Sequence, residues 1–268
     1  MFLTQIKKGL GLLAVLLLLS SCSEYQQVLK KGDLAAKTKA AEDYYKAGDY
    51  KKASRVLELI IPAYRGKPQG ERVLFWEADS YYNLGDYYLS SYKFERFSVA
   101  FPKSEKKEEA DFKHARSVYE LSAPYTLDQT ETYEGIDKLQ KFINNNPESE
   151  FLADANKYAG LLQKKLERKN YEIAKRFHHR KLYKSAIKAF DNYLIDYPGS
   201  DYTEEALYYK LESAYELAIN SFEQLVKERL KTARKYCGTY LENGKDENYI
   251  KNAQRITEDI KKRLEPVN

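Results

Sequence analysis

Cysteine is scarce in this sequence, which contains two in 268 residues, Cys22 and Cys237. Cys22 follows an apolar N-terminal run and two serines, where a signal peptide would end, so Cys237 is the one thiol expected in the folded part of the chain. A single thiol cannot form a disulfide within the chain, so stability must come from packing. We expect Cys237 to be a small packed side chain in a helix over 223–241, without a reactive role.

Histidine is also rare, with three residues, and this argues against a metal site. On a helix the adjacent His178 and His179 would point about 100° apart, so they cannot chelate one ion, and His114 is isolated. The G-x-S-x-G, H-E-x-x-H, P-loop and G-x-G-x-x-G motifs are all missing. The acidic pair Glu108–Glu109 opens a predicted helix and is interpreted as a partner of the helix dipole. We therefore expect no enzyme, no metal and no cofactor.

No apolar run is long enough for a transmembrane helix, which needs about 20 residues. The run Leu10–Leu19 is shorter, follows two lysines and precedes two serines, which is typical of a secretory signal peptide over 1–21. Leu19-Ser20-Ser21-Cys22 resembles the lipobox of bacterial lipoproteins, in which signal peptidase II cuts before the cysteine. The resemblance implies a mature chain that begins at Cys22 and is anchored to a membrane by lipid. The alternative is an ordinary secreted protein with Cys22 at the cut by chance.

Charge of one sign is not concentrated anywhere along the chain. The formal net charge is +5, with basic and acidic residues interspersed, so we expect no nucleic-acid partner. Tyrosine, in contrast, is abundant, with 25 residues. Its apolar ring and polar tip suit both half-buried seams between helices and binding grooves, and the count alone does not choose between them.

Glycine and proline are few, and they recur at regular places. Gly48-Asp49-Tyr50 returns as Gly85-Asp86-Tyr87, and a third copy, Lys181-Leu182-Tyr183, keeps only the tyrosine. Small residues lie nine positions before and three after each tyrosine: Ala41, Ala78, Ala174, Ala53, Ser90 and Ala186. Pro102 and Pro198 lie fifteen residues after the second and third tyrosine. The segments between these marks have helical periodicity.

This pattern resembles the tetratricopeptide repeat, a helix–turn–helix unit of about 34 residues. Small side chains let two antiparallel helices pack closely, and a proline ends the second helix because it lacks a backbone N–H. The fold class predicted is an all-α solenoid of about five helix pairs with a C-terminal capping helix. Its later helices are expected at 108–122, 129–146, 203–220 and 222–241, with the cap at 247–264.

The ends of the repeats carry a second pattern, Pro-x-Ser, at Ser104, Ser149 and Ser200. Each serine is followed by acidic residues, which predicts a serine N-cap on the next helix. With this pattern, the segment 149–216 resembles the C-terminal half of the BamD family, the tetratricopeptide lipoproteins of the outer-membrane β-barrel assembly machine. That family also shows a long helix running from one repeat into the next, as expected here around 151–169.

The resemblance covers about 22–245, with two departures. The first repeat has a Gly/Pro-containing loop at 61–70, so its second helix is expected to end early or differently. The turn at 123–129 lacks the glycine. The domain division expected is a signal peptide at 1–21, a lipidated linker at 22–32, peptide-groove repeats at 33–147, partner-docking repeats at 148–245, and a cap and tail at 246–268.

In tetratricopeptide stacks the first helix of each pair lines the concave side. Inward positions of the first two repeats place a set of polar and aromatic residues there: Thr38, Glu42, Tyr45, Lys46, Arg72, Phe75, Asp79, Tyr82 and Asn83. We predict a groove made by Tyr45, Lys46, Arg72, Phe75 and Tyr82. Its cations would pair the carboxylate of an extended peptide, and its aromatic floor would hold an aromatic side chain. The alternative is that these tyrosines fill seams between repeats.

The family resemblance implies a lipid-anchored scaffold on the periplasmic side of the outer membrane, and Ser23, where an Asp is missing, permits export there. It implies that the C-terminal repeats hold the periplasmic POTRA region of BamA, together with other lipoproteins of the assembly machine. The groove would receive the C-terminal signals of unfolded outer-membrane proteins. The alternative is another tetratricopeptide lipoprotein, such as a secretin pilotin or a cell-wall-associated adaptor.

Overall fold

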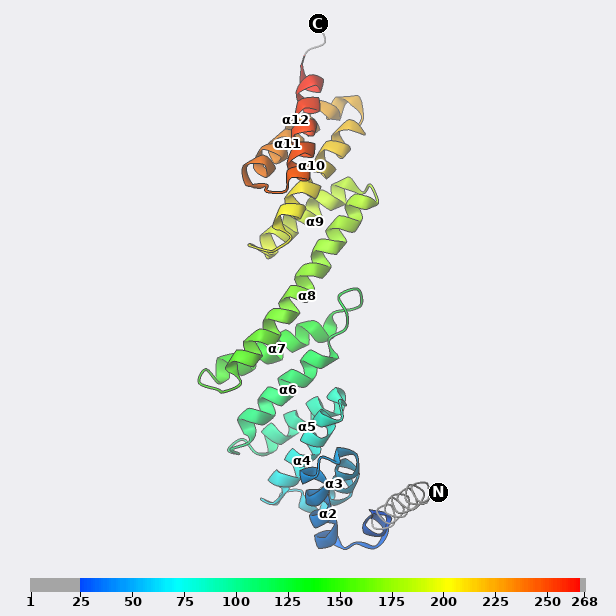
Figure 1. Ribbon diagram of the computed structural model, residues 1–268, viewed down its shortest axis with the longest axis vertical. Helices are drawn as coiled ribbons and strands as arrows, with labels where there is room; N and C mark the ends of the chain where they lie inside the picture. Colours follow the sequence, from blue (N-terminus) through cyan, green and yellow to red (C-terminus); the bar gives the residue numbers. More distant parts are fainter. Residues whose placement is uncertain (1–24, 266–268) are drawn as a thin grey trace, which may run out of the picture. The chain divides into compact units, whose positions relative to one another are not determined.

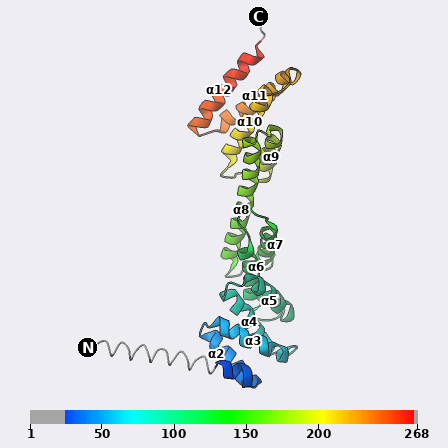
Figure 2. The same cartoon turned by 90° about the vertical axis from the view of Figure 1, so that its right-hand side faces the viewer.

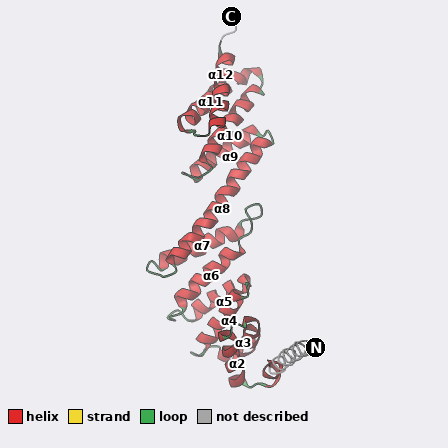
Figure 3. Ribbon diagram, viewed as in Figure 1, coloured by secondary structure: helices red, strands yellow, loops and turns green. Residues whose placement is uncertain are grey.

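The computed structural model describes residues 25–265, in which every regular element is a helix (Figures 1 and 3). Residues 25–31 are helical, and the labelled helices are α2 Leu34–Lys46, α3 Tyr50–Tyr64, α4 Gly70–Asn83, α5 Tyr87–Ala100, α6 Lys107–Leu121, α7 Thr130–Asn145, α8 Leu152–His179, α9 Tyr183–Asp196, α10 Thr203–Ile219, α11 Glu223–Asn243 and α12 Glu247–Leu264. The predicted all-α stack of helix pairs is confirmed. The predicted signal peptide and Cys22 lie outside the described residues.

The Gly-Asp-Tyr signature forms the turn within a pair. Gly48 and Gly85 have φ of +73° and +76°, a left-handed conformation that costs glycine nothing. The aspartate that follows caps the second helix, because the carboxylate of Asp49 accepts the Lys52 N–H at 3.3 Å. In the third copy Lys181 takes the same left-handed conformation, with φ of +60°, and the helix behind it has no side-chain cap.

The six small residues of the repeat pattern, Ala41, Ala53, Ala78, Ser90, Ala174 and Ala186, are all fully buried. This places them where the helices of a pair meet, as the register predicted. A larger side chain at these positions would push the two helices apart.

The serines of Pro-x-Ser close each pair by donating a hydrogen bond to a glutamate on the first helix of the same pair. The bonds are Ser104–Glu71 (2.6 Å), Ser149–Glu108 and Ser200–Glu167. In the last pair the backbone N–H of Asp246 takes the place of a serine and donates to Glu204 at 2.6 Å.

The predicted serine N-caps are wrong by two residues. The N-caps of α6 and α10 are Lys106 and Tyr202, and neither side chain caps its helix. The serine hydroxyl instead accepts the N–H two residues on, as Ser104 does from Lys106 at 2.9 Å. The hydroxyl therefore stabilises the turn between pairs rather than the first turn of the helix.

The described chain divides into two compact units. The first contains the described residues up to Ala123 together with Gln129–Leu162, and the second contains Pro124–Asp128 and the described residues from Gln163 onward. Helix α8, the longest at 28 residues, contributes its beginning to the first unit and its end to the second (Figure 2). In the second unit α12 buries Ala253, Ile256 and Ile260 against α10 and α11, as expected of a capping helix.

Three further expectations have clear outcomes. The second helix of the first repeat does not end early: α3 contains Pro62 and ends at Tyr64, so the loop predicted at 61–70 begins only after residue 64. Cys237 is buried among apolar side chains of the second unit, as predicted. None of the helices within residues 25–265 is long and apolar enough to span a bilayer.

Candidate functional site

A pocket of about 580 Å³ opens on the side of the first unit that α2, α4 and α6 form. This volume falls within the usual range for ligand sites. The lining consists of Tyr45, Pro68, Glu71, Arg72, Phe75, Trp76, Asp79, Lys106, Glu109 and Lys113. The first helix of each of three successive pairs therefore contributes, because these helices pack side by side along the stack.

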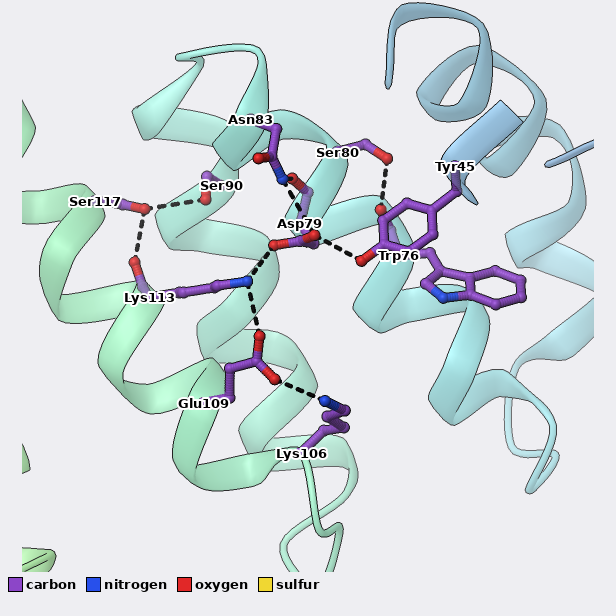
Figure 4. Close-up of polar contacts among 10 residues, drawn as sticks. All are labelled: Tyr45, Trp76, Asp79, Ser80, Asn83, Ser90, Lys106, Glu109, Lys113 and Ser117. Atoms are coloured by element: carbon purple, nitrogen blue, oxygen red, sulfur yellow. Dashed lines mark hydrogen bonds and ion pairs between the residues drawn. The ribbon is translucent and has the colours of Figure 1, made fainter. Parts of the chain in front are cut away.

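A hydrogen-bonded ladder crosses the three helices behind this pocket (Figure 4). The Tyr45 hydroxyl donates to Asp79 at 2.6 Å, and Lys113 donates to the same carboxylate at 2.5 Å. Asn83 gives it a third donor at 3.1 Å. Asp79 is only 5 % exposed, and these donors offset the cost of burying its charge. The ladder fixes α2, α4 and α6 relative to one another at the pocket.

The ladder continues along α6 towards the rim (Figure 4). Lys113 also bonds Glu109 at 2.8 Å, and Glu109 bonds Lys106 at 2.8 Å. Burial would raise the pKa of Glu109, but the hydrogen bonds from the two lysines outweigh it and lower the pKa. Burial would likewise lower the pKa of Lys113, whereas its bonds to Asp79 and Glu109 raise it. Glu109 and Lys113 are therefore both charged at neutral pH.

Two stacked aromatic rings, one from α2 and one from α4, hold a further cation of the lining. Trp76 lies on Tyr45, with ring centroids 5.4 Å apart and planes 29° from parallel. The Arg72 guanidinium lies over the indole, 4.8 Å from its centroid. Its nearest carboxylate among the described residues is Glu42, at the long distance of 3.9 Å. Arg72 is thus held in place, and its side chain remains 60 % exposed in the lining of the pocket.

Burial and the bond to Asp79 raise the pKa of Tyr45 above its ordinary value, so its hydroxyl stays a donor at any physiological pH.

The remaining carboxylate of the lining, Glu71, accepts a hydrogen bond from Ser104. Each carboxylate of the lining is therefore already bonded within the protein. The arrangement can accept an anion at Arg72 and Lys106, next to the apolar part of the lining that Trp76 and Phe75 provide.

The structure places three predicted groove residues, Tyr45, Arg72 and Phe75, in this lining. Lys46 lies outside it, exposed on α2 and bonded to Glu42 at 2.7 Å. Tyr82 also lies outside it, packed edge-on against Tyr87 and Phe94. Tyr82 therefore packs between helices, as in the alternative prediction, whereas Tyr45 both packs against another ring and lines the pocket.

Sequence reasoning missed six members of the lining: Pro68, Glu71, Trp76, Lys106, Glu109 and Lys113. A signal was present in the spacing, because Tyr45, Asp79 and Lys113 are separated by 34 residues each, one repeat length. The second unit contains a similar hydrogen bond, in which the Tyr171 hydroxyl donates to Glu205, again 34 residues away. Complementary polar residues at the repeat length therefore mark contacts between successive first helices.

Within the described residues, no three His, Cys, Asp or Glu side chains are grouped as metal ligands would be. A family model described as YfiO, outer membrane lipoprotein, matches residues 34–230, which span α2 to the middle of α11. The chain belongs to the YfiO family of outer membrane lipoproteins. Members of the YfiO family are non-enzymatic scaffolds. Family membership also gives the location of the protein, which is the outer membrane.

No curated protein matches the chain. Among solved structures, the chain is similar to one described as "Computational Design of Self-Assembling Cyclic Protein Homooligomers", with 14 % sequence identity and a TM-score of 0.21. That match covers 90 % of this chain and 88 % of the other. The similarity is too low to carry an inference about fold or function.

Proposed function

We propose that this YfiO-family lipoprotein is an adaptor of outer-membrane β-barrel assembly, and that its first unit binds the C-terminal signals of unfolded barrel proteins. Such a signal is an extended strand that commonly ends in an aromatic residue with a free carboxylate. The observation that carries the proposal is Arg72, held over Trp76 at the pocket mouth while the lining carboxylates are paired elsewhere. The terminal carboxylate would pair with Arg72, and the aromatic side chain would lie on the rings below.

A peptide titration tests this site. The probe is a labelled peptide that ends in phenylalanine, compared with the same peptide carrying a terminal amide. A charge-assisted hydrogen bond contributes about 1.5–3 kcal/mol, so Arg72→Ala should weaken binding of the free-acid peptide at least tenfold. Lys39→Ala is the matched control, because Lys39 is an exposed cation of α2 outside the lining that does not contact the carboxylate beside Arg72. Equal affinities for the acid and amide peptides would contradict the proposal.

Phe75→Ala is unsuitable for this test. Phe75 is 6 % exposed and packs edge-on against Phe94 and Phe97, so its truncation would leave a cavity in the core. Arg72, with a side chain 60 % exposed, can be changed without that loss. The variant separates binding from folding.

We assign the docking of the BamA POTRA region and of other assembly-machine lipoproteins to the second unit. The resemblance at 149–216 supports this assignment. So do Phe222, the N-cap of α11, and Leu225 in the first turn of that helix, which are 81 % and 43 % exposed. Phe222→Ser with Leu225→Ser should reduce BamA pull-down and leave peptide binding by the first unit unchanged. Retention of a secretin in place of BamA would favour a pilotin instead.

We further propose that Cys22 carries the lipid that attaches the protein to the outer membrane. Two or more acyl chains give stable attachment, since each buried methylene contributes about 0.8 kcal/mol. Cys22→Ala should abolish fatty-acid labelling and move the protein out of the membrane fraction. Unchanged labelling of this variant would contradict the assignment.

A further inference from the structure

A second groove, of about 410 Å³, lies between α3 and α5 with α4 as its floor. Leu74 and Glu77 of α4 line it, whereas Arg72, Trp76 and Asp79 line the pocket described above. At 3.6 residues per turn these two sets point to roughly opposite sides of α4. The groove therefore belongs to the other face of the first unit and shares no lining residue with the pocket.

The groove has apolar walls, and the carboxylates in its lining are paired with other groups of the protein. Ile61, Leu74 and Phe101 come from three elements and supply apolar walls. Glu77, whose side chain is 4 % exposed, pairs with Lys93 at 2.7 Å. Glu58 accepts from the Tyr81 hydroxyl and pairs with Arg55 at 3.4 Å. These groups offer little free negative charge to a ligand.

Two exposed arginines lie on the rim of the groove. Arg65 is the C-cap of α3, and Arg96 lies on α5, where it bonds the Tyr92 hydroxyl at 3.1 Å and stacks on that ring. Neither forms an ion pair with any residue in the described part of the chain. A guanidinium pairs a carboxylate through two parallel hydrogen bonds, and an aromatic face behind it holds its plane in place.

We propose that this groove is a second peptide-binding site of the first unit, and that it binds an extended acidic segment of a partner protein. An apolar side chain of the segment occupies the slot beside Ile61 and Leu74. Flanking carboxylates pair with Arg65 and Arg96, which supply the complementary charge. The groove volume falls in the range that holds a few side chains of a linear segment.

Because the groove and the pocket lie on opposite faces of α4, both can be occupied at the same time. A segment bound between α3 and α5 leaves Arg72 accessible. The two sites also differ in what they require of a ligand. The pocket is proposed to need a terminal carboxylate, whereas the groove needs only side-chain carboxylates.

That difference provides the test. The probe is a labelled peptide with alternating Glu or Asp and Leu or Phe, acetylated and amidated so that it has no terminal charge. It is titrated into the full mature protein by fluorescence anisotropy. The variant Arg65→Glu/Arg96→Glu should bind at least tenfold more weakly, and the neutral variant Arg65→Gln/Arg96→Gln should show a smaller loss. A probe with Gln and Asn in place of the acids should not bind.

Two control variants separate this proposal from the pocket. Lys51→Glu reverses an exposed charge of α3 outside the groove and should leave the affinity unchanged. Arg72→Ala should also leave it unchanged, while weakening the free-acid peptide of the pocket. Absence of probe binding, equal affinity in the Arg65/Arg96 variants, or loss with Arg72→Ala would each overturn the proposal. Arginine-dependent binding of phosphatidylglycerol vesicles without peptide binding would overturn it in favour of a membrane contact.

Discussion

At the residue scale, Lys181 stands where the other two copies of the turn have glycine. Its φ of +60° costs an L-residue about 1–2 kcal/mol. Glycine avoids this cost, but it loses more conformational entropy than lysine when the chain folds. Lys181→Gly should therefore raise the free energy of unfolding by about 0.5–1 kcal/mol, measured by urea denaturation. Lys184→Gly, a change inside α9, should lower it by about 1 kcal/mol. A loss of stability with Lys181→Gly would show that the lysine makes a compensating contact.

His114 supplies a pH dependence in the first unit. Burial lowers its pKa from the ordinary 6.5, although the bond to the Ser91 carbonyl opposes this, with Lys138, Glu95 and Asp111 nearby. Below about pH 6.5 the His114 side chain binds a proton in the unfolded chain more readily than in the folded chain. The free energy of unfolding therefore decreases as the pH falls. Urea denaturation should show a lower free energy of unfolding at pH 5.5 than at pH 7.5.

The variant His114→Asn isolates this contribution. It should be less stable than the wild type at pH 7.5, because the packing of the ring is lost. The difference between the two proteins should shrink at pH 5.5, since the variant has no group to protonate there. A difference that stays constant between the two pH values would contradict the assignment to His114.

At the scale of the element, the helix pairs depend on close approach at small residues. Ala186 of α9 is fully buried in the cluster that contains Ala174 and Phe190. Ala186→Leu should overpack this contact and lower the free energy of unfolding by about 1–3 kcal/mol. Because each repeat rests on its neighbours, hydrogen exchange should rise first around residues 167–200. Unchanged protection in that segment would mean that the contact tolerates the larger side chain.

Much of each helix pair could be predicted from sequence, because the determinants are local. A glycine with positive φ, an aspartate three residues before the N–H it accepts, and buried alanines act within one pair. The prediction of serine N-caps was wrong because the Ser104 hydroxyl donates instead to Glu71, which is distant in sequence. Pro62 stays inside α3 in its last turn, which the sequence pattern did not indicate.

The site was less predictable than the fold, for a physical reason. Its lining depends on the stagger between α2, α4 and α6, which side-chain packing between pairs decides. Trp76 and Lys113 reach the pocket through that stagger, whereas Tyr82 turns into the seam with Phe94. The 34-residue spacing of the Tyr45–Asp79–Lys113 ladder is the sequence feature that anticipates this arrangement.

At the scale of the whole molecule, the described chain forms two compact units, and the YfiO family match extends over residues of both. The first unit offers the pocket with Arg72 and, on its other face, the groove with Arg65 and Arg96. The second unit offers the exposed apolar side chains of Phe222 and Leu225 at the start of α11. The YfiO family consists of non-enzymatic scaffolds, and we propose that the two units bind different partners.

The central claim is that the pocket binds a carboxylate terminus, and Trp76 reports on it directly. It is the single tryptophan of the chain, it lies in the pocket, and Arg72 lies over its ring. Its fluorescence should change saturably when a tryptophan-free peptide ending in phenylalanine is titrated into the mature protein. The amidated peptide, or the Arg72→Ala variant, should require at least tenfold more peptide for the same change. A peptide that binds by anisotropy without altering Trp76 fluorescence would place its site elsewhere and contradict the account.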